Sequence, residues 1–192
     1  AFNYLDSGAI YRTLGIAVQK AYADFMNYAQ ITEIYNKSNI TFEPGKPHNV
    51  ILDGKDVSMI IRSQMGSDVA SKLGQIPEIR DILLEGQRAY RREPGLVADG
   101  RDMGTTVFPD ANLKIFLTAS VKERANRRYK QLITKGIDAT LPDLLQDLKE
   151  RDKRDTERIV SPLKPAGDAV TLDSTDLSID EVVIQILKLF LN

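Results

Sequence analysis

The chain has 192 residues, of which 42% are hydrophobic and 28% are charged, as in an ordinary globular protein. Its net charge is −1, so it has no overall positive field that would attract nucleic acid. Cysteine is absent and His48 is the only histidine, which argues against disulfides, metal sites built on thiolates or several histidines, and a serine-type catalytic triad. No apolar run approaches the roughly 20 residues that span a bilayer and no signal peptide is visible, so we expect a cytoplasmic protein without a membrane partner.

The chain opens with a predicted short strand over residues 3–5. A helix is expected next, because Ile10, Leu14 and Val18 recur at the i, i+4, i+8 spacing of a buried helical stripe. Ser7 stands where this helix begins, and on pattern alone it is favoured as the N-cap.

The pattern changes between about residue 31 and residue 63. Two β-prone runs, 39–43 and 50–52, flank a proline-containing turn, and the second run ends at Asp53-Gly54, which is a strong hairpin signal. We interpret this segment as a small antiparallel insertion outside the main sheet. His48 lies in the turn and is expected to be a surface residue.

Beyond the insertion the pattern becomes that of an α/β protein. Pro77 can open a helix over residues 78–91 as a first-turn proline. Short apolar strands and charged helices then follow, with strands expected at 96–98, 113–117 and 169–172 and helices at 121–134 and 141–158. The predicted architecture is a parallel sheet flanked by helices.

The last helix is predicted from the sequence at its start. Ser178 and Glu181 have the spacing of a capping box. The apolar residues behind this cap recur at helical spacing and are expected to form a buried face. They are Val182, Val183, Ile186, Leu187 and Phe190.

The strand at 96–98 carries the first chemical signal at its end. It runs into Asp99-Gly100-Arg101-Asp102, so two carboxylates and a guanidinium are expected at the C-terminal edge of a strand. Open α/β sheets bind their ligands at this edge. The alternative is a tight turn in which Gly100 and Gly104 only permit the backbone conformation.

Arginines are the second chemical signal, since phosphoryl transfer needs positive charge around the phosphates. Arg151, Asp155 and Arg158 are spaced by four and three residues, which predicts that they share a helical face. A solvated salt-bridge face has the same spacing, and on spacing alone it is the favoured interpretation.

A further group of arginines begins the helix at 121–134, where cations oppose the helix dipole and weakly indicate a nearby anion. Its members are Arg124, Arg127 and Arg128.

Six segments carry a resemblance to a known family. They are LDSGAIYR (5–12), ILDGKDVSMIIR (51–62), the stretch 71–80, GLVADGRDMGTTVFPDA (95–111), KERDKRDTER (149–158) and LDSTDLSIDEV (172–182). The most specific feature is VADGRDMGT with ERDKRDTER downstream. In order and extent these segments are similar to those of the bacterial cytidylate kinases.

The resemblance implies a P-loop nucleoside monophosphate kinase fold, in which a helix-flanked parallel sheet carries a small antiparallel insertion and a helical lid. It implies a monomeric enzyme that transfers the γ-phosphoryl group of ATP, with Mg²⁺, to CMP or dCMP. The implied parts are a core of residues 1–30, 81–120 and 159–192, a nucleoside monophosphate-binding insertion at 31–80, and a lid with arginine-bearing helices at 121–158.

The resemblance also implies which residues hold the base of CMP. They are Ser7, Arg80, Asp102 and Arg158. Asp102 can accept a hydrogen bond from the amino group of cytosine, and the arginines can donate to its carbonyl and ring nitrogen. Uracil would present a carbonyl to Asp102, so cytosine is expected to be preferred.

Other residues are implied to bind the phosphates and the ribose. Arg12 and Arg101 match a clamp on the α-phosphate of the acceptor, a task that suits bidentate guanidinium groups. Arg151 and Asp155 match the pair that reads the ribose and bridges toward the transferring phosphates. Ser71 is implied to support Asp155.

On the donor side, Arg127 and Arg128 match positions where the lid meets ATP. Asp99 is expected near a Mg²⁺-bound water, and no residue is expected to bind the metal directly. The predicted catalytic residues are Asp99, Arg101, Arg128 and Arg151.

One feature departs from the family pattern. None of the twelve glycines belongs to a phosphate-binding motif G-x-x-x-x-G-K-[ST]. In the family a central strand, this loop and a helix open the chain over roughly 25–30 residues. We therefore expect an incomplete chain with an acceptor half-site, a crippled donor site and little or no activity.

Two other functions fit parts of the pattern. A kinase-like protein that binds nucleotide without catalysis would explain the absent motif. A related small P-loop kinase with another acceptor would share most of the segments. Exchange of Asp102 or Arg158 for alanine would separate the latter from a cytidylate kinase, which should lose affinity for CMP selectively.

Overall fold

The structure is a computed structural model that describes residues 2–43, 46–134 and 136–191, with the backbone alone at residues 43 and 46–48. The predicted turn after residue 43 lies partly outside these ranges, and the exposure of the His48 side chain lies outside them altogether. The chain divides into two compact units, residues 1–103 and residues 104–192.

The first unit is built on a parallel strand pair and a helix. Strands β1 (Asn3–Asp6) and β5 (Leu96–Asp99) pair in parallel, with Asp6 opposite Asp99. Helix α1 (Ser7–Lys20) begins directly after β1, and ten of its 14 residues are buried. The predicted stripe of Ile10, Leu14 and Val18 is among the ten, so this prediction is confirmed.

The N-cap of α1 is Asp6, so the prediction of Ser7 at this position is wrong. Asp6 has an extended backbone conformation, and its Oδ1 accepts a hydrogen bond from the Ala9 backbone N–H at 2.8 Å. Ser7 is the first helical residue, and its side chain is buried. The carboxylate caps the helix because it stands at the last residue of the strand, one position before helical geometry begins.

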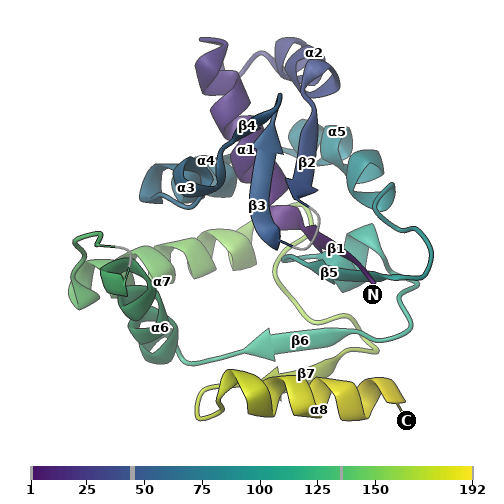
Figure 1. Cartoon of the computed structure of the whole chain (residues 1–192), viewed down its shortest axis with the longest axis vertical. Helices are drawn as coiled ribbons and strands as arrows, with labels where there is room; N and C mark the ends of the chain where they lie inside the picture. The colour runs from purple at the N-terminus through teal and green to yellow at the C-terminus, as the bar shows by residue number, and fades with distance from the viewer. Residues whose placement is uncertain (1, 44–45, 135, 192) are drawn as a thin grey trace. The chain divides into compact units, whose positions relative to one another are not determined.

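The antiparallel insertion is confirmed, and it forms a sheet of three short strands. They are β2 (Ile40–Glu43), β3 (Lys46–Leu52) and β4 (Lys55–Asp56). Asp53 and Gly54 both have positive φ, as a tight two-residue hairpin turn requires. Val50 and Leu52 of β3 pack in one buried cluster with Ala9 and Ile16 of α1. This cluster anchors the insertion to that helix, and Figure 1 shows the ribbons of β3 and α1.

Four more helices belong to the described part of the first unit. They are α2 (Tyr28–Lys37), α3 (Ser58–Ile61), α4 (Gln64–Leu73) and α5 (Pro77–Arg88). Pro77 occupies the first turn of α5 as predicted. Helix α1 packs against α2, α3 and α4, while α2 packs against α5. A Cβ on Gly86 would lie 1.9 Å from Tyr35 Oη, so glycine permits the close approach of α2 and α5.

The second unit contains the other parallel strand pair, β6 (Ile115–Thr118) and β7 (Val170–Asp173). A π-helical turn, η1 (Met103–Val107), precedes β6. Helices α6 (Val121–Thr134) and α7 (Leu141–Glu157) form a hairpin around the buried residues Ala125, Leu132 and Leu144. The predicted α/β class is therefore confirmed: parallel strands and helices, with a separate antiparallel insertion. No helix in the described ranges is long and apolar enough to cross a bilayer.

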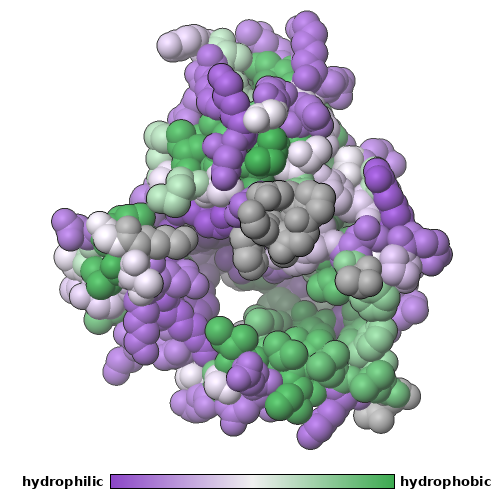
Figure 2. Space-filling model, in the orientation of Figure 1, coloured by the Kyte–Doolittle hydropathy of each residue, from purple (hydrophilic) through white to green (hydrophobic). Residues whose placement is uncertain are grey.

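The predicted buried face of the last helix is wrong, although its predicted cap is confirmed. Helix α8 (Ile179–Leu191) begins with the capping box, in which Ser178 Oγ accepts from the Glu181 N–H at 3.2 Å. Yet no described residue of α8 is buried, and Leu187 and Phe190 are 50% and 51% exposed. Apolar side chains gather on the surface over this helix (Figure 2). Periodicity decides which residues share a face, whereas burial requires a second surface that covers it.

Candidate active site

Charged side chains gather at the C-terminal edge of the β1–β5 pair. Asp6 and Asp99 end the two strands side by side. Desolvation by nearby protein atoms and then the charge of Asp6 raise the pKa of Asp99, although the residue still reaches solvent, while the charges of Arg101 and Arg12 lower it only in part. Burial and the same two carboxylates also raise the pKa of Tyr4 to about 12. Two guanidinium groups therefore act on a carboxylate at the edge where parallel sheets bind ligands.

Arg80 and Asp102 form a buried ion pair in the first unit. Arg80 Nη2 donates to Asp102 Oδ2, and the two side chains are only 8% and 6% exposed. Arg80 Nη1 also donates to the Gly74 carbonyl at 3.1 Å. Because desolvated charges are stable only when they are paired and hydrogen-bonded, the two residues hold one another in position.

Ser7 is held by a residue that the sequence analysis did not select. Its Oγ lies 2.6 Å from Gln87 Oε1, and both residues are buried. Gln87 belongs to the buried stripe of α5, together with Arg80 and Leu83. A polar residue seven positions after Arg80 on a predicted helix shares its face, and this spacing is the signal that could have identified Gln87.

Gly100 provides space in the loop after β5. Its φ is not in the left-handed region, so conformational freedom is not the reason for glycine at this position. A Cβ there would lie 3.0 Å from Ser7 Cβ and 2.8 Å from Met103 Cε. The glycine therefore lets the loop that carries Arg101 and Asp102 pass close to Ser7.

Ser71 lies on α4 and is buried. It belongs to the first unit, as do Ser7, Arg12, Arg80, Asp99, Arg101 and Asp102. The first unit thus contains every predicted residue for the base and the acceptor phosphate except Arg158. The remaining predicted residues belong to the second unit, and they are Arg127, Arg128, Arg151, Asp155 and Arg158.

The predicted shared face of three residues on α7 is correct for two of them. Arg151 Nε lies 3.8 Å from Asp155 Oδ2, and Asp155 is buried, so this pair is not part of a solvated face. Arg158 is the C-cap of α7 and has an extended backbone conformation, so it leaves the helical face. Its Nε donates to the Ser161 carbonyl, while the Leu163 N–H donates to the Asp155 carbonyl at 2.7 Å. The chain therefore folds back on the end of α7.

Protein acceptors surround two of the three arginines at the start of α6. Arg124 donates in a bidentate manner to Asp152 of α7, at 2.8 and 2.5 Å. Arg127 donates to Glu123 at 2.9 Å and to Ser174 Oγ at 3.1 Å. Carboxylates and a loop within the same unit thus account for the charges of Arg124 and Arg127, and only Arg124 lies near the first turn of α6, where the helix dipole acts.

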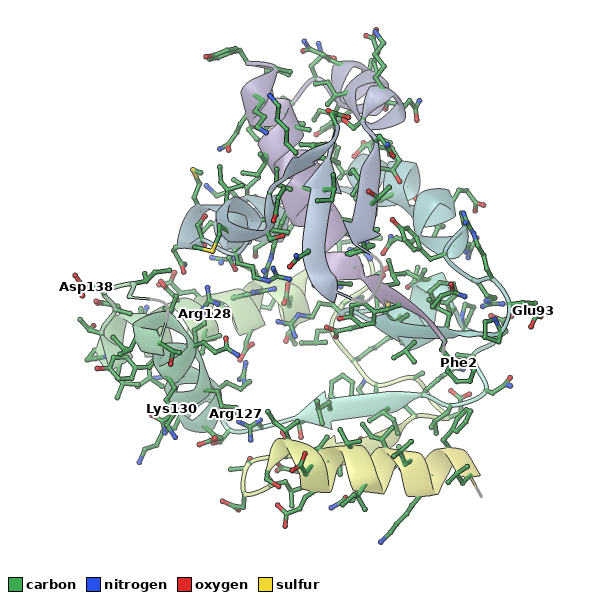
Figure 3. All side chains as sticks on the ribbon, in the orientation of Figure 1. Phe2, Glu93, Arg127, Arg128, Lys130 and Asp138 are labelled. Carbon is green, nitrogen blue, oxygen red and sulfur yellow. The ribbon has the colours of Figure 1, made fainter. Side chains whose placement is uncertain are left out.

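Arg128 follows Arg127 on α6 (Figure 3), and burial lowers the pKa of its guanidinium group. A desolvated cation binds an anion more strongly than a hydrated one does. Within the described ranges, no cluster of three or more histidine or acidic side chains could hold a metal ion. Asp6 and Asp99, which lie opposite one another in the strand register, are two acidic residues at this edge.

Comparisons with known proteins agree with the resemblance seen in the sequence. The model of the cytidylate kinase family matches residues 1–192. A cytidylate kinase from Pseudomonas putida is 51% identical over 188 residues, which are 96% of this chain and 82% of that protein. A cytidylate kinase from Cupriavidus necator is 48% identical over 189 residues, 98% of this chain and 84% of that protein. The chain therefore belongs to the cytidylate kinase family.

Proposed function

We propose that this chain is a nucleoside monophosphate kinase that transfers the γ-phosphoryl group of ATP to CMP or dCMP, giving CDP or dCDP. Family membership supports the reaction. The observation that carries the choice of acceptor is the buried ion pair between Arg80 of α5 and Asp102, which lies in the loop that passes close to Ser7. A buried carboxylate beside a guanidinium offers cytosine both an acceptor for its amino group and a donor for its carbonyl.

The acceptor phosphate is assigned to the strand edge. In this proposal Arg12 and Arg101 bind the α-phosphate of CMP. The charges of both arginines lower the pKa of Asp99, so both act at the strand edge. Their planar guanidinium groups can each donate two parallel hydrogen bonds to phosphate oxygens. Arg151 and Asp155 contact the ribose, Ser71 supports Asp155, and Arg158 completes the contacts to the base.

The donor is MgATP, and the proposed transfer is direct: an oxygen of the CMP phosphate bonds to the γ-phosphorus, the bond from that phosphorus to the β-phosphate oxygen breaks, and ADP leaves. Mg²⁺ bound to ATP would neutralise part of the negative charge on the phosphates. Asp99 would reach the metal through a bound water, and Arg127 and Arg128 would contact the triphosphate. Catalysis of this kind depends mostly on positioning and on electrostatic stabilisation of the spread negative charge.

The hairpin of α6 and α7 is proposed as the lid. Its closure would exclude water, so that the phosphoryl group passes to CMP and not to water. A cytoplasmic location and a monomeric state remain predictions, as does the division of the chain into core, insertion and lid.

A thermal melt of the 192-residue chain with CMP, dCMP and UMP tests the acceptor assignment. At one hundred times the dissociation constant, CMP should add about 2.7 kcal/mol to the free energy of unfolding. This corresponds to a rise in Tm of roughly 5–11 °C at this size. Saturating UMP at the same concentration should raise Tm much less, because Asp102 would face its carbonyl.

Two variants make the test specific. Asp102→Ala should abolish the shift with CMP, whereas Asp180→Ala, at an exposed position on α8, should keep it. Equal shifts with CMP and UMP would contradict the base assignment. A chain that binds CMP but forms no CDP with MgATP would instead support a nucleotide-binding protein without catalysis.

A further inference from the structure

We infer that Gln87 is a positioning residue that holds the Ser7 hydroxyl as a hydrogen-bond acceptor and so contributes to the choice of cytosine over uracil. The inference rests on the proposed function, because it requires that Ser7 faces the base. Gln87 itself need not touch the nucleotide. It acts indirectly, because its hydrogen bond with Ser7 determines whether the serine hydroxyl can donate or only accept.

The orientation of the Gln87 amide follows from its second partner. Gln87 Nε2 donates to the Leu83 backbone carbonyl at 3.3 Å, within α5. A carbonyl oxygen can only accept, so the amide nitrogen must face Leu83 and the amide oxygen must face away from it. The oxygen is then the atom that lies 2.6 Å from Ser7 Oγ.

The direction of the Ser7–Gln87 bond is fixed as a result. An amide oxygen has no proton to donate, so the Ser7 hydroxyl must donate to it. A hydroxyl has one proton and two lone pairs, and this proton is committed to Gln87. Toward any other group, Ser7 Oγ therefore presents lone pairs alone.

An acceptor at this position distinguishes the two pyrimidines. The amino group at C4 of cytosine donates, while the carbonyl oxygen at C4 of uracil accepts. A serine hydroxyl that could rotate would satisfy either base, as a donor or as an acceptor. Ser7 held by Gln87 can bind only the cytosine group, and uracil would place two acceptors face to face.

The surroundings keep this arrangement in place. Ser7 is 4% exposed and Gln87 is 2% exposed, so water has little access to replace their bond. Gln87 also lies on the same buried stripe of α5 as Arg80, which binds Asp102. One helix face thus contacts both Ser7 and Asp102, the two acceptors proposed for the cytosine amino group.

A double-mutant cycle in the full chain tests the inference. The dissociation constants of CMP and UMP are measured by calorimetry for the wild type, Gln87→Met, Ser7→Ala and the double variant. Methionine is similar in length but offers no amide oxygen. We expect Gln87→Met to reduce the preference for CMP over UMP about tenfold, the usual effect of one hydrogen bond, mainly through tighter binding of UMP. In the Ser7→Ala background, Gln87→Met should leave the preference unchanged.

The conservative variant Gln87→Glu distinguishes a positioning role of Gln87 from a role in packing alone. In Gln87→Glu, a protonated side chain would donate to the Leu83 carbonyl and still accept from Ser7, so this variant should keep the preference of the wild type. Gln87→Asn, whose shorter amide cannot reach Ser7, replaces the methionine variant in the cycle if that variant does not fold.

Two results would overturn the inference alone, in a wild type that prefers CMP. In the first, Gln87→Met weakens CMP and UMP by the same factor, which is the effect of a structural residue. In the second, Gln87→Met changes the preference equally with and without the Ser7 hydroxyl. A wild type with no preference for CMP would overturn the proposed function itself, and the inference with it.

Discussion

Asp99 is exposed at the strand edge, so its raised pKa corresponds to only a small cost in stability at neutral pH. Desolvation and Asp6 raise its pKa in the folded chain, so the folded state binds a proton more readily than the unfolded state does. The stability that this group contributes is therefore greatest at low pH, and it is lost as pH rises from the unfolded pKa through the raised folded pKa. A carboxyl group whose pKa is raised in this way, at an edge where ligands bind, is typical of a functional site.

Asp99→Asn should therefore raise the Tm at pH 7, because it removes a charge that the folded state disfavours. The gain should shrink as pH falls through the raised pKa of the folded state, because the carboxyl group of the wild type then takes up a proton. Thermal melts between pH 4 and pH 8 measure the difference. A lower Tm at pH 7 would show that Arg12 and Arg101 stabilise the ionised form more than desolvation and Asp6 disfavour it.

Asp168→Asn serves as a control of opposite sign. Its hydrogen bond with Lys114 lowers the pKa of the exposed Asp168 carboxyl group. This group contributes stability above its unfolded pKa and loses it as pH falls. Its replacement should lower the Tm slightly at pH 7 and have no effect at low pH.

Individual residues differed in how well the sequence could assign them. The loop after Asp99 was predictable because the end of a parallel strand is a fixed place in α/β folds. Gln87 was not selected, because its importance depends on Ser7, eighty positions away along the chain. The N-cap was misplaced by one residue because a strand and a helix meet there without a turn, and only the backbone angles separate Asp6 from Ser7.

At the scale of elements, α6 and α7 are joined by the bidentate contact between Arg124 and Asp152. Their side chains are 30% and 27% exposed, so solvent screens the contact only in part. This ion pair joins the same two helices as the apolar cluster around Ala125 and Leu144. It therefore contributes to the geometry of the proposed lid.

Separate and combined replacement of Arg124 and Asp152 by alanine should reveal a coupling energy of about 1 kcal/mol, at the upper end for partly exposed pairs. Denaturant unfolding of the four proteins measures it. Exposed Lys37 and Glu33, neighbours on α2, form the matched control, with an expected coupling of about 0.3–0.5 kcal/mol. Equal couplings would mean that the bidentate geometry adds nothing.

Elements were predicted well where their local sequence decides their structure. Pro77, the Asp53-Gly54 turn and the capping box at Ser178 each act within a few residues, and each is present as expected. The end of α7 was predicted one residue too late, because the fold-back after Arg158 depends on contacts with Ser161 and Leu163. The exposed face of α8 could not be predicted, because burial depends on the rest of the fold.

At the scale of the whole molecule, the residues proposed to bind CMP are divided between the two compact units. The first unit carries Ser7, Arg12 and Asp102, and the second carries Arg151 and Asp155. This assignment requires that bound CMP protects residues of both units. A measurement of protection at individual segments therefore tests the assignment.

Saturating CMP should slow amide hydrogen exchange at residues 7–12 and at residues 151–158. At one hundred times the dissociation constant, exchange that requires opening of the site should slow by about a hundredfold. The amides of α8 should not change, and UMP should produce little slowing anywhere. Slowing confined to the first unit would contradict the roles proposed for Arg151, Asp155 and Arg158.

In the proposed base site, the ion pair between Arg80 and Asp102 should also affect the rate at which CMP associates. Before the base arrives, each buried charge already has a partner, so a small anion or cation that drifts past gains little by entering. The base must offer a donor to the carboxylate and an acceptor to the guanidinium within the same encounter, since separation of the pair without both is costly. A base that presents an acceptor where the carboxylate needs a donor, as uracil does with its C4 carbonyl, gains too little to open the pair. Selection then begins during entry, in the association rate constant, and not only in how long the bound nucleotide stays.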